Sequence, residues 1–172
     1  MERYSKYMPS EAFRTILRNF GKTIGLTELS ADDDDYCCLS IDDHLILHLK
    51  YDPRNNDIVL FAELGHVDEE KKAGLYRLLL ELNSSIEEAQ GCTLAKLQDE
   101  TIIALCYKEP FENIEQQRFE AIMKVFLETC ETCLKKITEF SQGLLSVQSQ
   151  SDKNKEPSRA ESINDIPFGM RV

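Results

Sequence analysis

The chain has 172 residues, enough for one domain with a buried core and a tail. It is acidic, with 20 Lys and Arg against 31 Asp and Glu, and it contains no Trp. A net charge of −11 repels nucleic-acid phosphates and anionic membranes, which argues against both as partners. No stretch is long and apolar enough for membrane insertion, and residues 1–10 are polar and show no secretory signal. We therefore expect a cytoplasmic protein whose six cysteines are reduced.

The first periodic segment predicts a helix over residues 10–24. Phe13, Ile16, Leu17 and Phe20 follow the i, i+3, i+4, i+7 spacing of one helical face. An acidic run at positions 32–35 then separates this helix from the next elements.

Three strands follow, and we expect them to form an antiparallel meander. In the middle strand Leu45, Leu47, Leu49 and Tyr51 alternate with Ile46 and its polar neighbours, which gives the strand two different faces. The acidic pair at positions 42 and 43 suits a tight hairpin, and the run at 52–57 is rich in turn residues. The predicted strands cover residues 36–41, 44–51 and 58–64.

The second half predicts a helix, two strands and a long helix. The helix from Asp68 is apolar around most of its surface, so either the monomer buries both sides or one side meets a partner. Strands follow at 92–97 and 101–107, and the last helix begins near Phe111 or Glu112. The fold class is therefore α+β with a five-stranded, mostly antiparallel sheet, formed by residues 1–143. Residues 144–172 predict a disordered polar tail.

No residue cluster predicts catalysis, a cofactor or a metal. His44 and His48 lie about 13 Å apart along a strand, too far to share one ion. Cys130 and Cys133 have C-x-x-C spacing, but both fall on the apolar stripe of a helix and are expected to pack in the core. The acidic run at 32–35 lacks the alternating ligands of a calcium loop and is expected to be solvated. The chain is therefore not expected to be an enzyme.

The feature that does point to a function is a second apolar face on the predicted sheet. Val59 and Phe61 face away from Ile58 and Leu60 on their strand, and with Ile46 they form a second apolar face of the sheet. An exposed patch of this kind indicates a binding site. The alternative is that the domain itself buries both faces.

The order and composition of these elements resemble the class I type III secretion chaperones, and among them those that carry several cargo proteins. The resemblance covers residues 10–140. It is carried by the spacing of Phe13, Ile16, Leu17 and Phe20, by the hairpin Cys37-Cys38-Leu39-Ser40-Ile41 with Leu45-Ile46-Leu47-His48-Leu49, and by the segments Leu75-Tyr76-x-Leu78-Leu79-Leu80-Glu81-Leu82-Asn83, Gly91-Cys92-Thr93-Leu94 and Ile102-Ile103-Ala104-Leu105. Size and acidity also agree, although the tail after Gly143 is longer than the family core requires.

The resemblance implies a homodimer with α/β sandwich-like protomers. The second helix and a late strand would form its two-fold interface, through Leu75, Leu78, Leu79, Leu82, Ile103, Leu105 and Tyr107. Cargo would bind as an extended segment, through Ile46, Val59, Phe61, Leu17 and Phe20.

The function that the resemblance implies is a bacterial cytoplasmic chaperone. It would bind the N-terminal region of secreted effector proteins, keep that region partly unfolded, and deliver it to the secretion apparatus through a component such as its ATPase. The alternative is an adaptor or regulatory subunit that forms an obligate heterodimer with another small chaperone.

Overall fold

A computed structural model describes residues 8–42, 45–98, 101–112 and 114–144. It confirms the predicted α+β class and order of elements, with one additional short helix. His44 and residues 145–172 of the predicted tail lie outside the described residues. In chain order the elements are α1 (Met8–Thr23), β1 (Tyr36–Ile41), β2 (Leu45–Asp52), β3 (Asp57–His66), α2 (Lys72–Ser84), α3 (Ile86–Ala89), β4 (Thr93–Lys96), β5 (Ile102–Pro110) and α4 (Gln116–Ser141).

The five strands form one antiparallel sheet in the order β1-β2-β3-β5-β4. The β1–β2 register pairs Ile41 with Leu45, so positions 42–44 connect the two strands, rather than the two-residue connection predicted. The β3–β5 register shifts between Glu63 and Gly65, which marks a bulge near the end of β3. Strands β1 and β4 are the two edges of the sheet.

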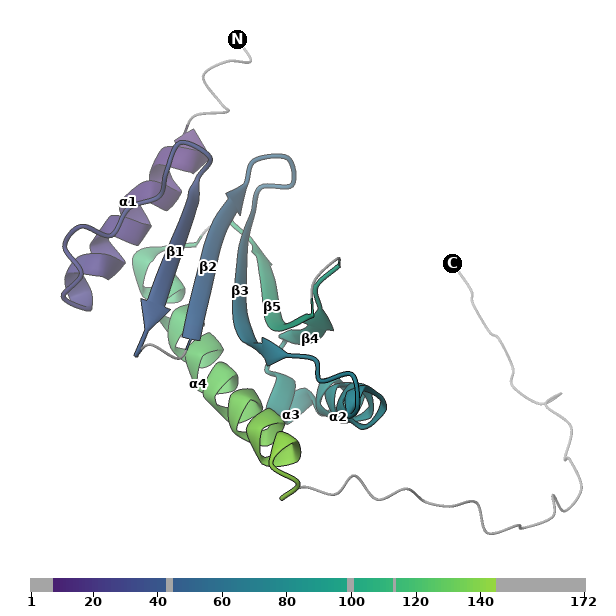
Figure 1. Ribbon diagram of the computed structural model, residues 1–172. Helices are drawn as coiled ribbons and strands as arrows, with labels where there is room; N and C mark the ends of the chain where they lie inside the picture. The colour runs from purple at the N-terminus through teal and green to yellow at the C-terminus, as the bar shows by residue number, and fades with distance from the viewer. Residues whose placement is uncertain (1–7, 43–44, 99–100, 113, 145–172) are drawn as a thin grey trace, which may run out of the picture.

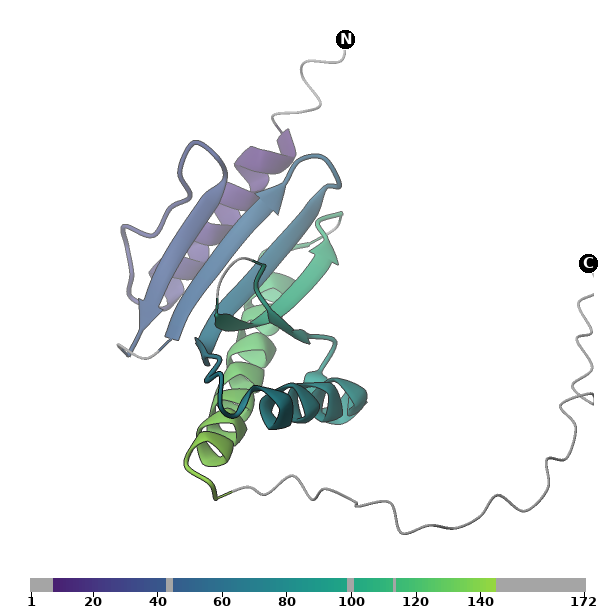
Figure 2. The same cartoon turned by 45° about the vertical axis from the view of Figure 1, so that its right-hand side comes forward.

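One face of the sheet is covered by α1 and α4, as Figures 1 and 2 show from two directions. The predicted alternation of β2 is confirmed, because Leu45, Leu47, Leu49 and Tyr51 are buried on the covered face. Ile46 lies on the opposite face and is 41% exposed. No helix in the described part of the chain lies over that opposite face (Figure 2).

Helix α1 faces the core with the residues that its periodicity predicts. Phe13 packs against Tyr51 and Phe111, with ring centroids 6.0 and 6.2 Å away. Leu17 and Phe20 were expected to contact cargo, but they are buried under the sheet and against α4. The assignment of these two residues is corrected: the first helix uses its apolar face to build the core, so neither side chain is accessible.

Helix α2 begins at Lys72 rather than at Asp68. The Asp68 carboxylate accepts a hydrogen bond from the Glu70 N–H at 3.0 Å, and the Lys71 N–H donates to the Asp68 carbonyl, so these residues form a turn before the helix. Gly74 lies where a Cβ would come within 2.8 Å of the Phe140 ring, so the glycine permits close packing of α2 on α4. The helix buries Leu75, Leu78, Leu79 and Leu82 within the chain and leaves Leu80 exposed.

Helix α4 begins at Gln116, a few residues later than predicted. The preceding residues are held elsewhere: β5 continues to Pro110, and the Phe111 N–H donates to the Asn56 carbonyl at 2.8 Å. Cys130 and Cys133 are buried on the inner face of α4, which confirms their predicted place in the core. None of the helices in the described ranges is long and apolar enough to cross a membrane.

Candidate functional site

The outer edge of β1 is open over most of its length. The Tyr51 N–H donates to the Asp35 carbonyl at 3.0 Å, whereas the Tyr36 carbonyl accepts from the Asp32 N–H at 2.8 Å on the other side. Backbone groups alternate between the two sides of an antiparallel strand. The N–H and C=O groups of Cys38 and Ser40 therefore point away from β2. Within the described residues, no backbone hydrogen bond satisfies these groups on the outer side.

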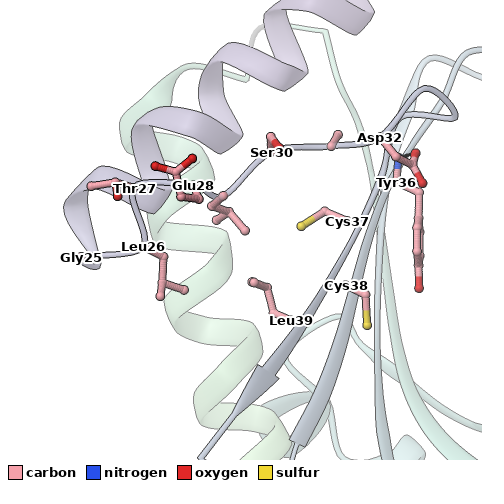
Figure 3. A pocket seen from close by; sticks show the side chains of 12 residues that line it. Gly25, Leu26, Thr27, Glu28, Ser30, Asp32, Tyr36, Cys37, Cys38 and Leu39 are labelled. Carbon is pink, nitrogen blue, oxygen red and sulfur yellow. Dashed lines mark hydrogen bonds between the residues drawn. The ribbon is translucent and has the colours of Figure 1, made fainter.

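A groove of about 710 Å³ lies beside this open edge. Its outer wall is the segment of residues 25–32, which returns from the end of α1 toward the start of β1 (Figures 1 and 3). Cys37 and Leu39 point toward that segment, whereas Tyr36 and Cys38 point to the opposite side of β1 (Figure 3). Leu26 adds a 47% exposed side chain at the wall. The groove thus combines apolar side chains with unpaired strand groups.

Asp35 fixes the upper end of the groove to α1. Its carboxylate accepts a hydrogen bond from the Ser10 Oγ at 2.7 Å and from the Arg14 Nε at 2.6 Å. The same contact raises the pKa of Arg14, because hydrogen bonding to the carboxylate favours the charged guanidinium. Asp35 also has a positive φ of 55°, a conformation that most side chains avoid. These contacts hold the acidic turn in place.

Acidic residues stand at both ends of β1. Asp32 is used locally, because its Oδ1 accepts from the N–H groups of Asp34 and Tyr36 at 2.9 and 3.0 Å. Asp33 and Asp34 are exposed at the start of the strand, and Asp42 is exposed at its end. Over the described ranges, no hydrogen bond or ion pair engages the carboxylates of these three residues. The predicted solvated loop is therefore confirmed, except for Asp35.

The uncovered face of the sheet brings together Ile46, Val59 and Phe61, as the sequence predicts. The Phe61 ring stacks on His48, with centroids 4.0 Å apart and planes within 6°. His48 is hydrogen-bonded on both sides, from Nδ1 to the Tyr36 hydroxyl at 2.6 Å and from Nε2 to Glu63 at 3.0 Å. This confirms a structural role for His48.

A second hollow of about 900 Å³ lies on this face between the acidic turn and the β2–β3 turn. Tyr36, Lys50, Val59 and Phe61 form its floor, and Ile46 lies further along the same face. Since Tyr36 is the first residue of β1, this hollow adjoins the open edge of the strand. The candidate site therefore extends around β1, with the groove on one side and the apolar face on the other.

The opposite edge of the sheet is capped at Leu94. The side-chain amide of Asn83 on α2 donates to the Leu94 carbonyl at 3.0 Å, and the Leu94 N–H donates to the Asn83 Oδ1 at 2.8 Å. The backbone groups of Leu94 and Lys96 point outward from β4, and at Leu94 the Asn83 side chain takes the place of a neighbouring strand.

The residues predicted for a dimer interface are mostly buried within one chain. This applies to Leu75, Leu78, Leu79, Leu82, Ile103 and Leu105, while Tyr107 is half-buried. The interface stays a prediction, and the side chains that fill the core leave little of their own surface for a second copy. Leu80 is 69% exposed and is the apolar residue of α2 that faces outward.

Most thiols of the domain are buried, and burial keeps them protonated. Burial raises the pKa of Cys37 and Cys92 to about 11, and it raises the pKa of Cys130 further. Cys38 is exposed on the uncovered face. Among the described residues, no group of three or more metal-ligating side chains could hold an ion.

The sequence did not identify the groove. Cys38, Ser40 and Leu39 were recognised as part of a strand, but the strand's position at the edge depends on the order of strands in space. One feature of the sequence could have indicated the groove. Apolar Leu26 and Leu29 lie in the otherwise polar connection before β1, where a solvated loop would not require them.

Comparison with known proteins identifies the class and then the family. The fold is that of type III secretion chaperones. One similar structure is the ExsC–ExsE complex, with a TM-score of 0.62 and 20% identity over 74% of this chain and 94% of that one. The HopA1–SchA chaperone–effector complex gives a TM-score of 0.59 and 19% identity over 73% and 94%. The Yersinia pestis type III secretion chaperone SycH, in complex with a fragment of YscM2, gives 0.52 and 17% over 70% and 98%.

The family profile of the Tir chaperone protein (CesT) family matches residues 15–134. The chain belongs to this family, which confirms the resemblance seen in the sequence. Among curated proteins no relative matches.

Proposed function

We propose that this protein is a type III secretion chaperone that binds an extended segment of an effector along β1. It acts in the bacterial cytoplasm without turnover, keeps the bound segment from folding, and hands it to the secretion apparatus through a component such as its ATPase. The observation that carries this proposal is the open edge of β1 beside an apolar groove.

The physical basis is strand addition. An extended segment beside β1 would pair with the N–H and C=O groups of Cys38 and Ser40, while its alternate side chains enter the groove near Leu39. A segment held this way has its backbone groups engaged and cannot form its own fold. The uncovered face with Ile46, Val59 and Phe61 would take the continuation of the segment around the strand.

The structural neighbours support a protein partner of this kind. SchA with HopA1 is described as a chaperone–effector complex, and SycH is a type III secretion chaperone bound to a fragment of another protein. The similarity to them is one of fold, so the transfer of an effector partner to this chain is part of the proposal.

Amide hydrogen exchange measured by NMR tests the site of binding. The amides of Cys38 and Ser40 should exchange quickly in the free protein and at least about tenfold more slowly when a saturating effector N-terminal peptide is added. The matched control is the Leu39 amide, which faces β2 and should be protected in both states. Unchanged exchange at Cys38 and Ser40, with bound peptide, would place the segment elsewhere.

The proposal includes a homodimer formed through the outer face of α2. Leu80→Asp should leave the fold intact and weaken association by at least about tenfold, because a charge replaces an apolar contact. Ile24→Asp, at an apolar position near the end of α1 that is 47% exposed, is the matched control away from α2. Light scattering should give twice 19.8 kDa for the wild type and half of that for Leu80→Asp.

The adaptor hypothesis predicts a different result in the same measurement. An obligate heterodimer would give a monomer or an undefined aggregate for the purified wild type, whatever residue stands at position 80. A dimer that survives Leu80→Asp would instead contradict the placement of the interface.

A further inference from the structure

The charge around β1 defines the chemistry of the segment that the groove accepts. We infer that this segment is a short apolar strand with basic residues at both of its ends. The inference rests on the proposed function, because it specifies the occupant of the same groove. It follows from where the acidic residues lie and from which of them are already engaged.

The strand and its acidic ends set a length for the occupant. β1 spans six residues, from Tyr36 to Ile41, and six residues of strand extend about 20 Å. Asp34 and Asp33 lie two and three residues before its first residue, and Asp42 directly follows its last. A paired segment would therefore bring its two ends close to carboxylates, and basic residues about six to eight positions apart would reach both groups.

These carboxylates differ from the others near the strand because none of them forms a hydrogen bond or ion pair within the described residues, although the charge of Asp33 helps to raise the pKa of Arg14. Asp35 is paired with Arg14 and Ser10, and Asp32 accepts two backbone hydrogen bonds. For Asp33, Asp34 and Asp42, the described part of the chain offers no such partner. A Lys or Arg of the bound segment would supply that partner, whereas Asp or Glu would be repelled.

Between its basic ends the segment must present apolar residues on one side only. The groove side of β1 carries Cys37 and Leu39 (Figure 3). The facing wall carries exposed Leu26, with Leu29 buried beneath it. Because side chains alternate along a strand, every second residue of the occupant would enter this space. The intervening residues would lie over the uncovered face.

Three synthetic peptides test the inference, with one apolar alternating core flanked by two Lys, two Ser or two Glu residues at each end. Their affinities for the full-length protein are measured by isothermal titration calorimetry. The Lys-flanked peptide should bind about tenfold more tightly than the Ser-flanked one at low salt, and the Glu-flanked peptide about tenfold more weakly. The differences should shrink at high salt, where exposed charges are screened. A Lys-flanked peptide with a Ser core is the control for charge alone and should not bind.

A double variant locates the source of the preference. Asp33→Asn with Asp34→Asn should remove most of the advantage of the Lys flanks and leave the Ser-flanked affinity unchanged. Glu87→Gln with Glu131→Gln changes the net charge equally at exposed sites away from β1, and should leave the advantage intact. A preference for Lys that survives the Asp33 and Asp34 changes overturns the inference.

The outcomes separate this inference from the proposed function. If the three peptides bind β1 equally, the groove accepts extended segments but its charge does not select them. If none binds, the proposed function fails with the inference. If a second copy or residues 163–172 of the chain fill the groove, the Cys38 and Ser40 amides are already slow to exchange before any peptide is added, which also overturns it.

Discussion

The two edges of the sheet are built in opposite ways. At β4 the Asn83 side chain makes both backbone hydrogen bonds of Leu94, and α2 lies alongside. At β1 the corresponding groups of Cys38 and Ser40 are open, although the segment of residues 25–32 runs nearby. Edge strands are usually protected against pairing with other chains. This sheet has a side-chain cap at Leu94 on one edge and open backbone groups beside a groove at the other.

The difference indicates that specific contacts maintain the open edge of β1. The acidic turn that joins the wall of the groove to β1 is tied to α1, because Asp35 accepts hydrogen bonds from Ser10 and Arg14. Both edge strands pack on the same buried core. They differ in whether their outward backbone N–H and C=O groups are hydrogen-bonded.

The largest expected change in stability comes from a substitution in the core beneath both edges. Leu17 is fully buried on α1, so Leu17→Ala should lower the free energy of unfolding by about 2–5 kcal/mol, as for other buried leucines. Urea unfolding followed by circular dichroism measures it, and Thr15→Ala on the exposed side of α1 is the control. A stable variant that only binds cargo more weakly would restore Leu17 to the binding surface.

Alkaline pH should destabilise the protein at both edges. Cys37 in β1 and Cys92 before β4 have a pKa of about 11 when folded, against an ordinary value of 9.0. The unfolded chain therefore loses these protons first, and each thiol should remove about 2 kcal/mol of stability as pH rises from 9 to 11, with no loss below pH 9. In urea unfolding, Cys37→Ala should lose less stability than the wild type over this range. Parallel curves would show that the Cys37 thiol ionises normally.

The closed edge should open when its side-chain cap is removed. Asn83→Ala leaves the N–H and C=O of Leu94 without partners, which should cost about 2 kcal/mol of unfolding free energy. The variant should also form larger species in size-exclusion chromatography, because two edges are then open. Asn19→Ala, exposed on α1, is the control. Unchanged stability would mean that water replaces the amide at no cost.

Removing a backbone N–H donor from the open edge of β1 should weaken the binding of an effector segment. Ser40→Pro deletes an N–H that points away from β2, so it should weaken binding of an effector segment about fivefold to tenfold, or about 1 kcal/mol. Ser40→Ala keeps the N–H and should bind normally. Equal affinities for these two variants would mean that the segment does not pair with β1.

The helices and strands with a regular apolar pattern could be predicted from sequence, because the spacing of apolar residues within one segment shows which side is buried. Leu45, Leu47, Leu49 and Tyr51 alternate with Ile46, and the structure places them as this alternation requires. Helix starts were less accurate, since Asp68 and Phe111 are engaged in turn and loop hydrogen bonds that no periodicity reveals.

The site was only partly predictable because it depends on strand order and on which apolar residues the core uses. Ile46, Val59 and Phe61 were found from their alternation. Leu17 lies on an equally regular apolar stripe, but no local pattern distinguishes a stripe that meets the core from one that meets a partner. The closure of β4 by Asn83 depends on a contact between residues 11 positions apart and could not be anticipated.

The acidic ends of β1 also bear on how the protein tolerates an open edge. If two copies paired their β1 strands in antiparallel fashion, Asp33 and Asp34 of one would lie beside Asp42 of the other. Like charges placed opposite each other on neighbouring strands are destabilising. The carboxylates that would attract a basic segment thus oppose fibre-like growth through the same strand, so one set of side chains serves both recognition and resistance to aggregation.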